Sequence, residues 1–229
     1  MTRALSSGHL CLGVILGILL SLVGIQASFF WTFDKSSTGE QEGINVFQPI
    51  PNRRYGVPRI RQNFEDQTNV ILNNQLIRAY LQASYRYLAM SKYMDRADMA
   101  RPGFSKFFME ASEREYRNAK TLMDYINKRG GQLEFSTIPT PVRTTWADGL
   151  EAVTDSLNVQ KGIQKEILGV HTQAEAAGDP HLSQVLEGNF LDQNTELIKK
   201  LADYVAQLER LKKDNNSSLG EYVFEQNLK

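Results

Sequence analysis

The chain has 229 residues, enough for one domain of about 170 residues with extensions. Acidic and basic residues are equal in number, 26 of each, so the formal net charge is zero. This balance gives no support for a nucleic-acid partner, because such partners usually meet a basic face. The one cysteine, Cys11, lies in an apolar run near the start, which excludes a fold stapled by its own disulfides.

Residues 1–27 follow the order of a secretory signal peptide. Arg3 gives a small positive end, residues 10–23 are almost wholly apolar, and small residues follow, so cleavage is expected after Ala27. The alternative is an uncleaved signal anchor, because aromatic residues within 29–33 extend the apolar stretch towards the length of a membrane span. The expected location is therefore secreted or in the secretory-pathway lumen, with a membrane contact only for the anchor.

Residues 28–60 have the pattern of a flexible N-terminal arm. The stretch is largely polar, carries glycine, serine and proline, and shows no sustained apolar period. Pro49, Pro51 and Pro58 argue against a long helix or a central strand there. Regular hydrophobic patterning begins only after the arm, in residues 61–229.

Apolar residues at steps of three and four predict two long helices in the first half of that patterned region. The first begins near Asn63, which is the expected N-cap, and ends near Lys92. The second runs from about Gly103 to Lys128 and stops at the glycine pair 130–131, a strong helix terminator. No stretch of useful length alternates as a strand does, so the sequence predicts an all-α fold.

The connection after the second helix, residues 132–145, is long for a helical bundle. A long crossover joins the second and third helices when both point the same way. The third helix is expected to open with Trp146 and to fade at residues 176–178. The predicted architecture is thus a four-helix bundle with a long crossover between helices two and three.

Asp179 and Pro180 mark the start of a fourth long helix, with the aspartate as N-cap and the proline at the first helical position. Its apolar stripe continues to about Lys212. A polar break follows, and residues 219–226 form a short fifth helix.

Glu115 is the most informative residue, because it falls on the apolar stripe of the second helix. A carboxylate that faces a core is costly unless it is paired or bound to a metal. In di-iron bundles a Glu-x-x-His motif supplies two metal ligands from one helix. Here the residue three positions later is Asn118, a poor metal ligand, so the pattern indicates a metal site that has lost a ligand.

Several strings resemble the eukaryotic ferritins in order and spacing, over residues 61–229. The strings are Arg61–Phe64 (RQNF), Tyr80–Tyr85 (YLQASY), Asn127–Gly131 (NKRGG), Asp179–Leu182 (DPHL) and Leu219–Phe224 (LGEYVF). The chain is most similar to the light, non-catalytic type of subunit, whose first helix carries the same YLQASY string. This resemblance implies a ferritin-like bundle.

The resemblance also implies where the di-iron centre of heavy-type subunits would fall. The tyrosine beside that centre is kept as Tyr87 and the bridging glutamate as Glu115. The other ligand positions carry residues that differ from the heavy-type pattern: Tyr80, Asn118, Gln160 and Asn194. Because iron sites need anionic oxygen donors with a nitrogen donor, no complete ferroxidase centre is expected. A polar network around Glu115, hydrogen-bonded or paired with a basic side chain, is the expected replacement. A single-metal site that uses Glu115 is the alternative.

Two weak iron sites are further implied by the resemblance. The mineral-nucleating positions of light-type subunits fall on Glu110, Glu113, Arg114 and Arg117. The arginines are expected to pair with those glutamates and to weaken the site. The acidic rings of the three-fold pores fall on Gln184 and Glu187, near which His171 and His181 are expected. A ring of carboxylates from Glu187 would attract cations.

The polar break between the fourth and fifth helices contains two overlapping N-glycosylation acceptors, Asn215 and Asn216. A plain turn is the alternative interpretation of the same residues.

The resemblance predicts a light-type iron-storage subunit and not an enzyme. It implies a 24-subunit shell built from this chain and heavy-type subunits, with Fe2+ in transit and Fe3+ as the stored mineral. Two alternatives remain open from the sequence: a ferroxidase with an altered di-iron ligand set, and a structural shell protein that holds no iron.

Overall fold

The computed structural model describes residues 60–213 and 217–228. The predicted signal peptide, residues 1–27, lies outside this part, as does the arm of residues 28–60 except for Ile60. Asn215 and Asn216, the predicted glycosylation acceptors, also lie outside the described residues.

All the regular secondary structure in residues 60–213 and 217–228 is helical, and no strand occurs there. The elements in order are α2 (Asp66–Ile71), the π-helical turn η2 (Leu72–Ile77), α3 (Arg78–Met94), α4 (Pro102–Arg129), α5 (Gly149–Ala176), α6 (Pro180–Leu186), the π-helical turn η3 (Glu187–Leu191), α7 (Asp192–Lys213) and α8 (Ser217–Gln226). None of the helices in residues 60–213 and 217–228 is long and apolar enough to cross a membrane.

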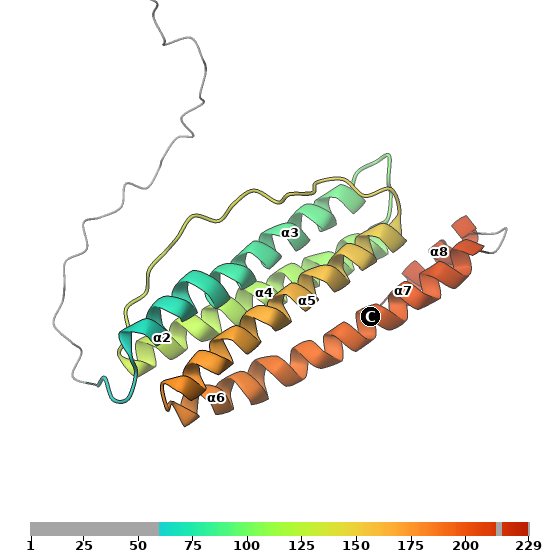
Figure 1. The fold of residues 1–229 in the computed structure, drawn as a ribbon. Coiled ribbons are helices and arrows are strands. Elements are labelled where there is room, and N and C mark those ends of the chain that lie inside the picture. Colours follow the sequence, from blue (N-terminus) through green and yellow to red (C-terminus); the bar gives the residue numbers. More distant parts are fainter. Residues whose placement is uncertain (1–59, 214–216, 229) are drawn as a thin grey trace, which may run out of the picture. The chain divides into compact units, whose positions relative to one another are not determined.

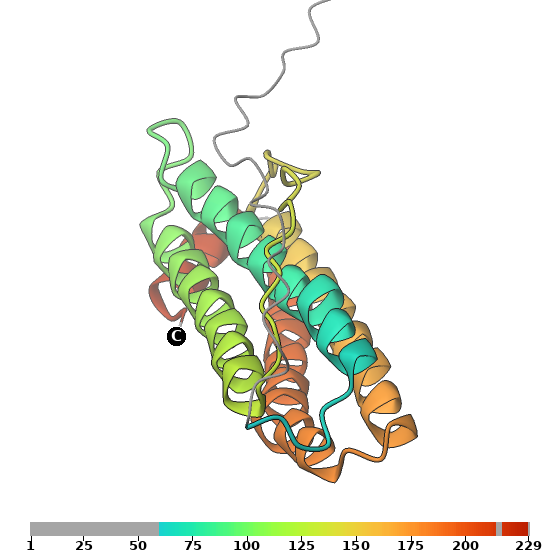
Figure 2. The ribbon, with the colours of Figure 1, turned by 90° about the vertical axis from the view of Figure 1, so that its left-hand side faces the viewer.

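Four long helical rods form the bundle, and α8 is the short fifth helix (Figure 1). The first rod is α2, η2 and α3 in continuous sequence, and the fourth is α6, η3 and α7. A long connection runs the length of the bundle from the end of α4 to the start of α5, so these two helices point the same way (Figures 1 and 2). The predicted all-α bundle with its long crossover is confirmed.

The core lies where the apolar stripes of the rods meet. Stripes of this kind arise because residues three and four apart share one helix face. Fully buried members come from every rod, and they include Leu72, Leu76, Phe104, Phe108, Ile126, Val153, Ile167, Leu186 and Leu201. Each such side chain contributes about 1.5–3 kcal/mol by leaving water. Burial of this extent holds the bundle without any disulfide.

Local sequence signals set several helix ends as predicted. Gly130 closes α4 in the left-handed conformation with φ 74°, which side chains other than glycine rarely adopt. Asp179 caps α6, because its Oδ1 accepts the backbone N–H of Leu182 at 3.1 Å, with Pro180 at the first helical position.

Two predicted helix starts are wrong. Asn63 does not cap the first helix, which begins at Asp66. The side chain of Asn63 instead donates to the carbonyl of Gly178 at 3.2 Å. Trp146 does not open the third helix, which begins at Gly149. The helix instead starts after the N-cap Asp148, whose side chain accepts the backbone N–H of Glu151, so Trp146 lies before the cap.

The crossover is fixed near both of its ends by buried polar groups. Asn69 and Asn73 both donate to the carbonyl of Gln132, at 3.0 and 2.8 Å, and their oxygens accept the backbone N–H groups of Gln132 and Glu134. At the other end Trp146 is buried and donates to Asp155 at 2.9 Å. The asparagine contacts satisfy backbone groups of the crossover that no regular structure pairs.

The Gly130→Ala variant should lower the free energy of unfolding by about 1–2 kcal/mol, because an L-residue there is held in the left-handed region. A Cβ at this position would also meet the backbone N of Arg61 at 3.1 Å. The matched control is Gly169→Ala in the exposed middle of α5, where a Cβ meets nothing within 4 Å. That change should raise the free energy by about 0.5–1 kcal/mol. Urea unfolding followed by circular dichroism measures both free energies. A change in the same direction in both variants would contradict the left-handed conformation of Gly130.

Candidate functional site

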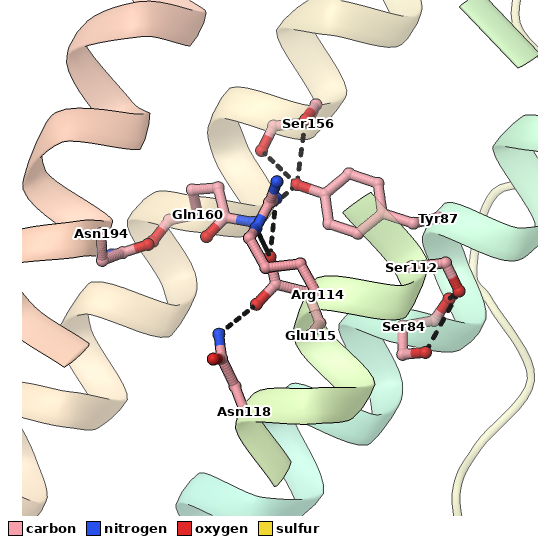
Figure 3. A network of polar contacts seen from close by, with 9 residues as sticks. All are labelled: Ser84, Tyr87, Ser112, Arg114, Glu115, Asn118, Ser156, Gln160 and Asn194. Carbon is pink, nitrogen blue, oxygen red and sulfur yellow. Dashed lines mark hydrogen bonds and ion pairs between the residues drawn. The ribbon is translucent and has the colours of Figure 1, made fainter. Parts of the chain in front are cut away.

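A pocket of about 230 Å³ lies inside the bundle, around the carboxylate of Glu115. Its wall combines aromatic, amide and charged side chains from α3, α4, α5 and α7: Tyr80, Arg114, Glu115, Asn118, Gln160 and Asn194. Four rods therefore converge on one buried acidic group (Figure 3). This is the place where the sequence predicted the remnant of a metal centre.

The carboxylate of Glu115 is almost fully buried, with its side chain 2% exposed. One oxygen, Oε1, accepts the Arg114 Nε and Nη2 groups at 3.0 and 2.8 Å and the Gln160 amide at 2.9 Å. The other, Oε2, accepts the Asn118 amide at 3.1 Å. Figure 3 shows these donors surrounding the carboxylate. Hydrogen bonds and one opposite charge thus compensate the buried anion.

Tyr87 extends the network towards α5. Its hydroxyl accepts the Gln160 amide at 2.8 Å and lies 2.9 Å from the hydroxyl of Ser156. Burial, followed by the nearby charge of Glu115, raises the pKa of Tyr87 well above its usual value. The phenol therefore stays neutral at physiological pH and serves as a fixed hydrogen-bonding group.

Asn194 closes the network from α7. Its amide donates to the backbone carbonyl of Gln160 at 3.1 Å and to the Gln164 side chain at 2.7 Å. Tyr80 stands at the position where the resemblance places a glutamate ligand. Its ring packs against that of Phe190, with the ring centroids 5.8 Å apart. Burial, together with the charge of Glu115, raises the pKa of Tyr80, so this phenol is also neutral.

The residues present do not fit a di-iron centre. Two carboxylates line the pocket, the buried Glu115 and the exposed Glu196, and the Arg114 guanidinium holds one oxygen of Glu115. A cation next to that oxygen would face both the guanidinium charge and a shell of neutral amides. Across residues 60–213 and 217–228, no group of three or more His, Cys, Asp or Glu side chains has the geometry to hold a metal ion.

The predicted nucleation residues lie on the exposed face of α4. Glu113 pairs with Arg117 at 3.8 Å, and Glu110 lies 4.0 Å from Lys106. Both glutamates are more than half exposed, so these pairs are weak. The expected pairing of arginines with exposed glutamates thus occurs for Arg117 and not for Arg114, which turns inward to Glu115.

The predicted pore residues are only partly brought together. Glu187, in η3, has its Oε1 2.7 Å from His171 Nε2, and Glu175 lies 3.7 Å from the other ring nitrogen. His181 is elsewhere: it stacks on Tyr125 and its Nδ1 lies 3.1 Å from that hydroxyl. The structure therefore joins His171 with Glu187 in one cluster and assigns His181 to the helix end at Asp179.

Arg114 is the site residue that sequence reasoning assigned to the wrong side of α4. Adjacent helical residues do not normally face each other, so spacing gave no reason to pair it with Glu115. The signal that was available is the charge of Glu115, because a buried carboxylate that binds no metal ion needs a cationic side chain as its partner.

Residues 71–211 match the family model of the ferritin-like domain. The chain belongs to the ferritin family. It is 38% identical over 169 residues to soma ferritin of Lymnaea stagnalis, covering 74% of this chain and 94% of that protein. It is 37% identical to the ferritin lower subunit of Aquarana catesbeiana, covering 72% and 95%. It is 41% identical to a ferritin heavy chain of Echinococcus granulosus, covering 72% and 93%.

The Arg114→Ala variant of this ferritin should lower the free energy of unfolding by about 1–3 kcal/mol. The loss follows because Glu115 would stay buried without its opposite charge, and it is moderated because Arg114 is one-third exposed. Arg117→Ala, which breaks the exposed pair with Glu113, is the matched control and should cost less than about 0.5 kcal/mol. Chemical denaturation compares the two. Similar small losses would show that Arg114 does not neutralise Glu115.

Stability should fall as the pH rises above about 10, because the pKa of Tyr87 is higher in the folded chain than in the unfolded one. The unfolded chain then releases a proton that the folded chain keeps, so each such tyrosine contributes a slope of about 1.4 kcal/mol per pH unit. Tyr87→Phe removes one of these protons and should make the slope shallower by that amount. Urea unfolding at several pH values between 9.5 and about 11.5 measures it, and an unchanged slope would contradict the burial of the phenol.

Proposed function

We propose that this ferritin is a subunit of the light type, which stores iron without a complete ferroxidase centre of its own. The observation that carries the proposal is the pairing of Glu115 with Arg114 at 2.8 Å inside the bundle. A guanidinium supplies there the positive charge that a metal ion would supply in a catalytic bundle. Iron is accordingly cargo for this chain, with Fe2+ in transit and Fe3+ as the stored mineral.

Oxidation of iron would be the task of a heavy-type partner subunit in the same shell. The pocket around Glu115 offers neutral amides from Gln160 and Asn194 where a di-iron site needs anionic donors. The comparisons support a mixed assembly in a general way, since relatives of this chain carry the names ferritin heavy chain and ferritin light chain. We infer a hollow shell of 24 subunits, as the resemblance implies.

Exposed apolar side chains support such an assembly. Phe135 and Val142 in the crossover are 80% and 99% exposed, and α8 leaves three large apolar side chains more than half exposed. Leu219, Tyr222 and Val223 are spaced so that they lie near one another on α8, and apolar side chains exposed as a group mark contacts with other proteins. Other subunits of the shell are the partners that would cover them.

Weak iron sites in such a shell would come from exposed carboxylates. Glu110 and Glu113 lie on one face of α4, where they would help to nucleate mineral, although Lys106 and Arg117 offset part of their charge. Glu187 would attract Fe2+ at the pores, with His171 beside it. Glu115 is excluded from these sites because its oxygens are occupied.

We further propose that the shell is secreted or lies in the lumen of the secretory pathway. The apolar run of residues 10–23 and the small residues before position 28 support this location. The acceptors Asn215 and Asn216 would then carry N-linked glycan, which is a mark of that pathway.

Iron oxidation by the purified chain tests the central proposal. The homopolymer should oxidise Fe2+ slowly and without the fast, saturable phase of a di-iron centre. Shells co-assembled with a catalytically complete heavy-type subunit should oxidise iron rapidly and accumulate ferric mineral. A fast phase in the homopolymer would overturn the proposal in favour of a ferroxidase with another ligand set. Mixed shells that never retain iron would favour a purely structural protein.

Restoring the missing ligands should work only if the arginine is removed as well. One variant combines Tyr80→Glu, Asn118→His and Gln160→Glu with Arg114→Ala. The matched control carries the same three ligand changes and keeps Arg114. The first should gain an oxidation phase above the homopolymer, whereas the control should gain much less, because the guanidinium still holds Glu115. Equal rates in both would show that Arg114 does not block the site.

A further inference from the structure

The short helix α8 reaches the N-termini of two long helices through two glutamates. Glu221 and Glu225 lie one turn apart and so share a face of α8. Glu225 accepts the backbone N–H of Gly103, in the first turn of α4, at 2.6 Å. Glu221 accepts the backbone N–H of Gly149, at the start of α5, also at 2.6 Å.

Arg101 joins the two carboxylates. Its Nη2 lies 3.3 Å from Glu221 and its Nη1 lies 3.7 Å from Glu225. Both carboxylates are largely buried, with side chains 15% and 2% exposed. A guanidinium between two buried carboxylates compensates part of their charge and holds them at a fixed separation.

The helix α4 depends on this contact because it has no cap of its own. Arg101 stands at the N-cap without a side-chain hydrogen bond, and the first turn contains no acidic residue. Pro102 has no N–H, so Gly103 carries the first free donor of the helix. Glu225 therefore supplies both the hydrogen bond and the negative charge that favour a helix N-terminus.

The helix α5 differs, since it already has a local cap. The Asp148 side chain accepts the backbone N–H of Glu151 at 2.8 Å, and the Glu151 side chain accepts the backbone N–H of Ala147 at 2.7 Å. Glu221 adds a second carboxylate to this start. Lys212 of α7 offsets the added charge by pairing with Asp148 at 2.8 Å.

Two glycines allow the approach. A Cβ at Gly103 would lie 2.5 Å from Cγ of Glu225, and a Cβ at Gly149 would lie 2.5 Å from Oε1 of Glu221. Real Cβ atoms do not come so close to other atoms. Any larger residue at Gly103 must therefore push Glu225 out of its position.

The opposite side of α8 is apolar and open. Leu219, Tyr222 and Val223 are each more than half exposed, whereas Phe224 is buried and stacks against Phe104 of α4. The side of α8 that meets solvent is therefore decided by the contacts of Glu221, Glu225 and Phe224.

We propose that Glu221 and Glu225 form a carboxylate latch, which holds α8 in its docked pose and completes the N-terminus of α4. When the latch is closed, Leu219, Tyr222 and Val223 face outward and are available to other copies of this chain. When the latch is broken, α8 leaves the bundle and the first turn of α4 loses its cap. The consequence for assembly rests on the proposed shell, whereas the latch itself does not.

Amide hydrogen exchange of the purified chain tests the latch directly. Glu225→Ala should speed exchange about ten- to hundredfold in α8 and in the first turn of α4, because a buried charged acceptor is lost. Exchange in the middle of α4 and in α7 should stay unchanged. The control is Glu209→Ala on the exposed surface of α7, which should leave all four regions as they are. Unchanged exchange in α8 of Glu225→Ala would overturn the latch.

A second pair of variants separates the latch from general damage. Gly103→Ala should stabilise α4 if only helix propensity mattered, since alanine is the better helix former. The latch predicts the opposite, with faster exchange in α8, because the new Cβ displaces Glu225. Glu225→Gln keeps an acceptor oxygen and should fall between Glu225→Ala and the unmodified chain. Protection of α8 in Gly103→Ala equal to that of the unmodified chain would also overturn the proposal.

Native mass spectrometry of the same variants connects the latch to the shell. Glu225→Ala should form fewer complete assemblies than Glu209→Ala at equal concentration. If hydrogen exchange shows an open latch and assembly is unchanged, the latch stands and its role in assembly is wrong. Neither readout depends on iron, so failure of the iron-storage proposal would be seen separately, in the oxidation assay.

Discussion

The buried carboxylate of Glu115 is the constraint around which the bundle is arranged. An ionised group in a core needs an opposite charge and a full set of hydrogen bonds, and here Arg114, Gln160 and Asn118 supply them. A catalytic bundle meets the same demand with metal ions and further carboxylates. The two solutions exclude each other, because a guanidinium and a metal cation cannot both approach the same oxygen without repulsion. The structure has the first solution, and the neutral phenols of Tyr80 and Tyr87 belong to it.

Pairs of arginine and carboxylate also hold the two ends of the bundle. At one end Arg129 binds Asp179 at 2.9 Å and donates to the carbonyl of Asn63, which ties α4 to α6 and to the segment before α2. At the other end Arg101 lies between the two glutamates of α8. All of these pairs are partly or fully buried. Water and salt therefore screen their attraction less than they screen pairs on the surface.

The sequence predicted most of what local rules determine, although the helix cap at Asp148 was missed, and it could not predict what depends on contacts distant in the chain. Stripe periodicity gave the four long rods, and Gly130 and Asp179 gave their ends, because each acts within one helical turn. The cap at Glu225 was beyond such rules, since its partner Gly103 lies 122 residues away. The inward turn of Arg114 was missed for a different reason: two adjacent residues share no helix face, and only the side-chain conformation brings them together.

The light-type interpretation therefore depends on charge more than on missing ligands. Replacing Asn118 and Gln160 by metal ligands would add donors to the pocket while Arg114 still occupied Oε1 of Glu115, so the ligand count alone does not decide whether iron binds. Because Arg114 compensates the carboxylate, a bundle of the proposed light type would need no metal ion at this site to be stable. In the proposed light-type role, such a subunit would keep its shape without a bound metal ion, which suits the wall of a storage shell more than a catalyst within it.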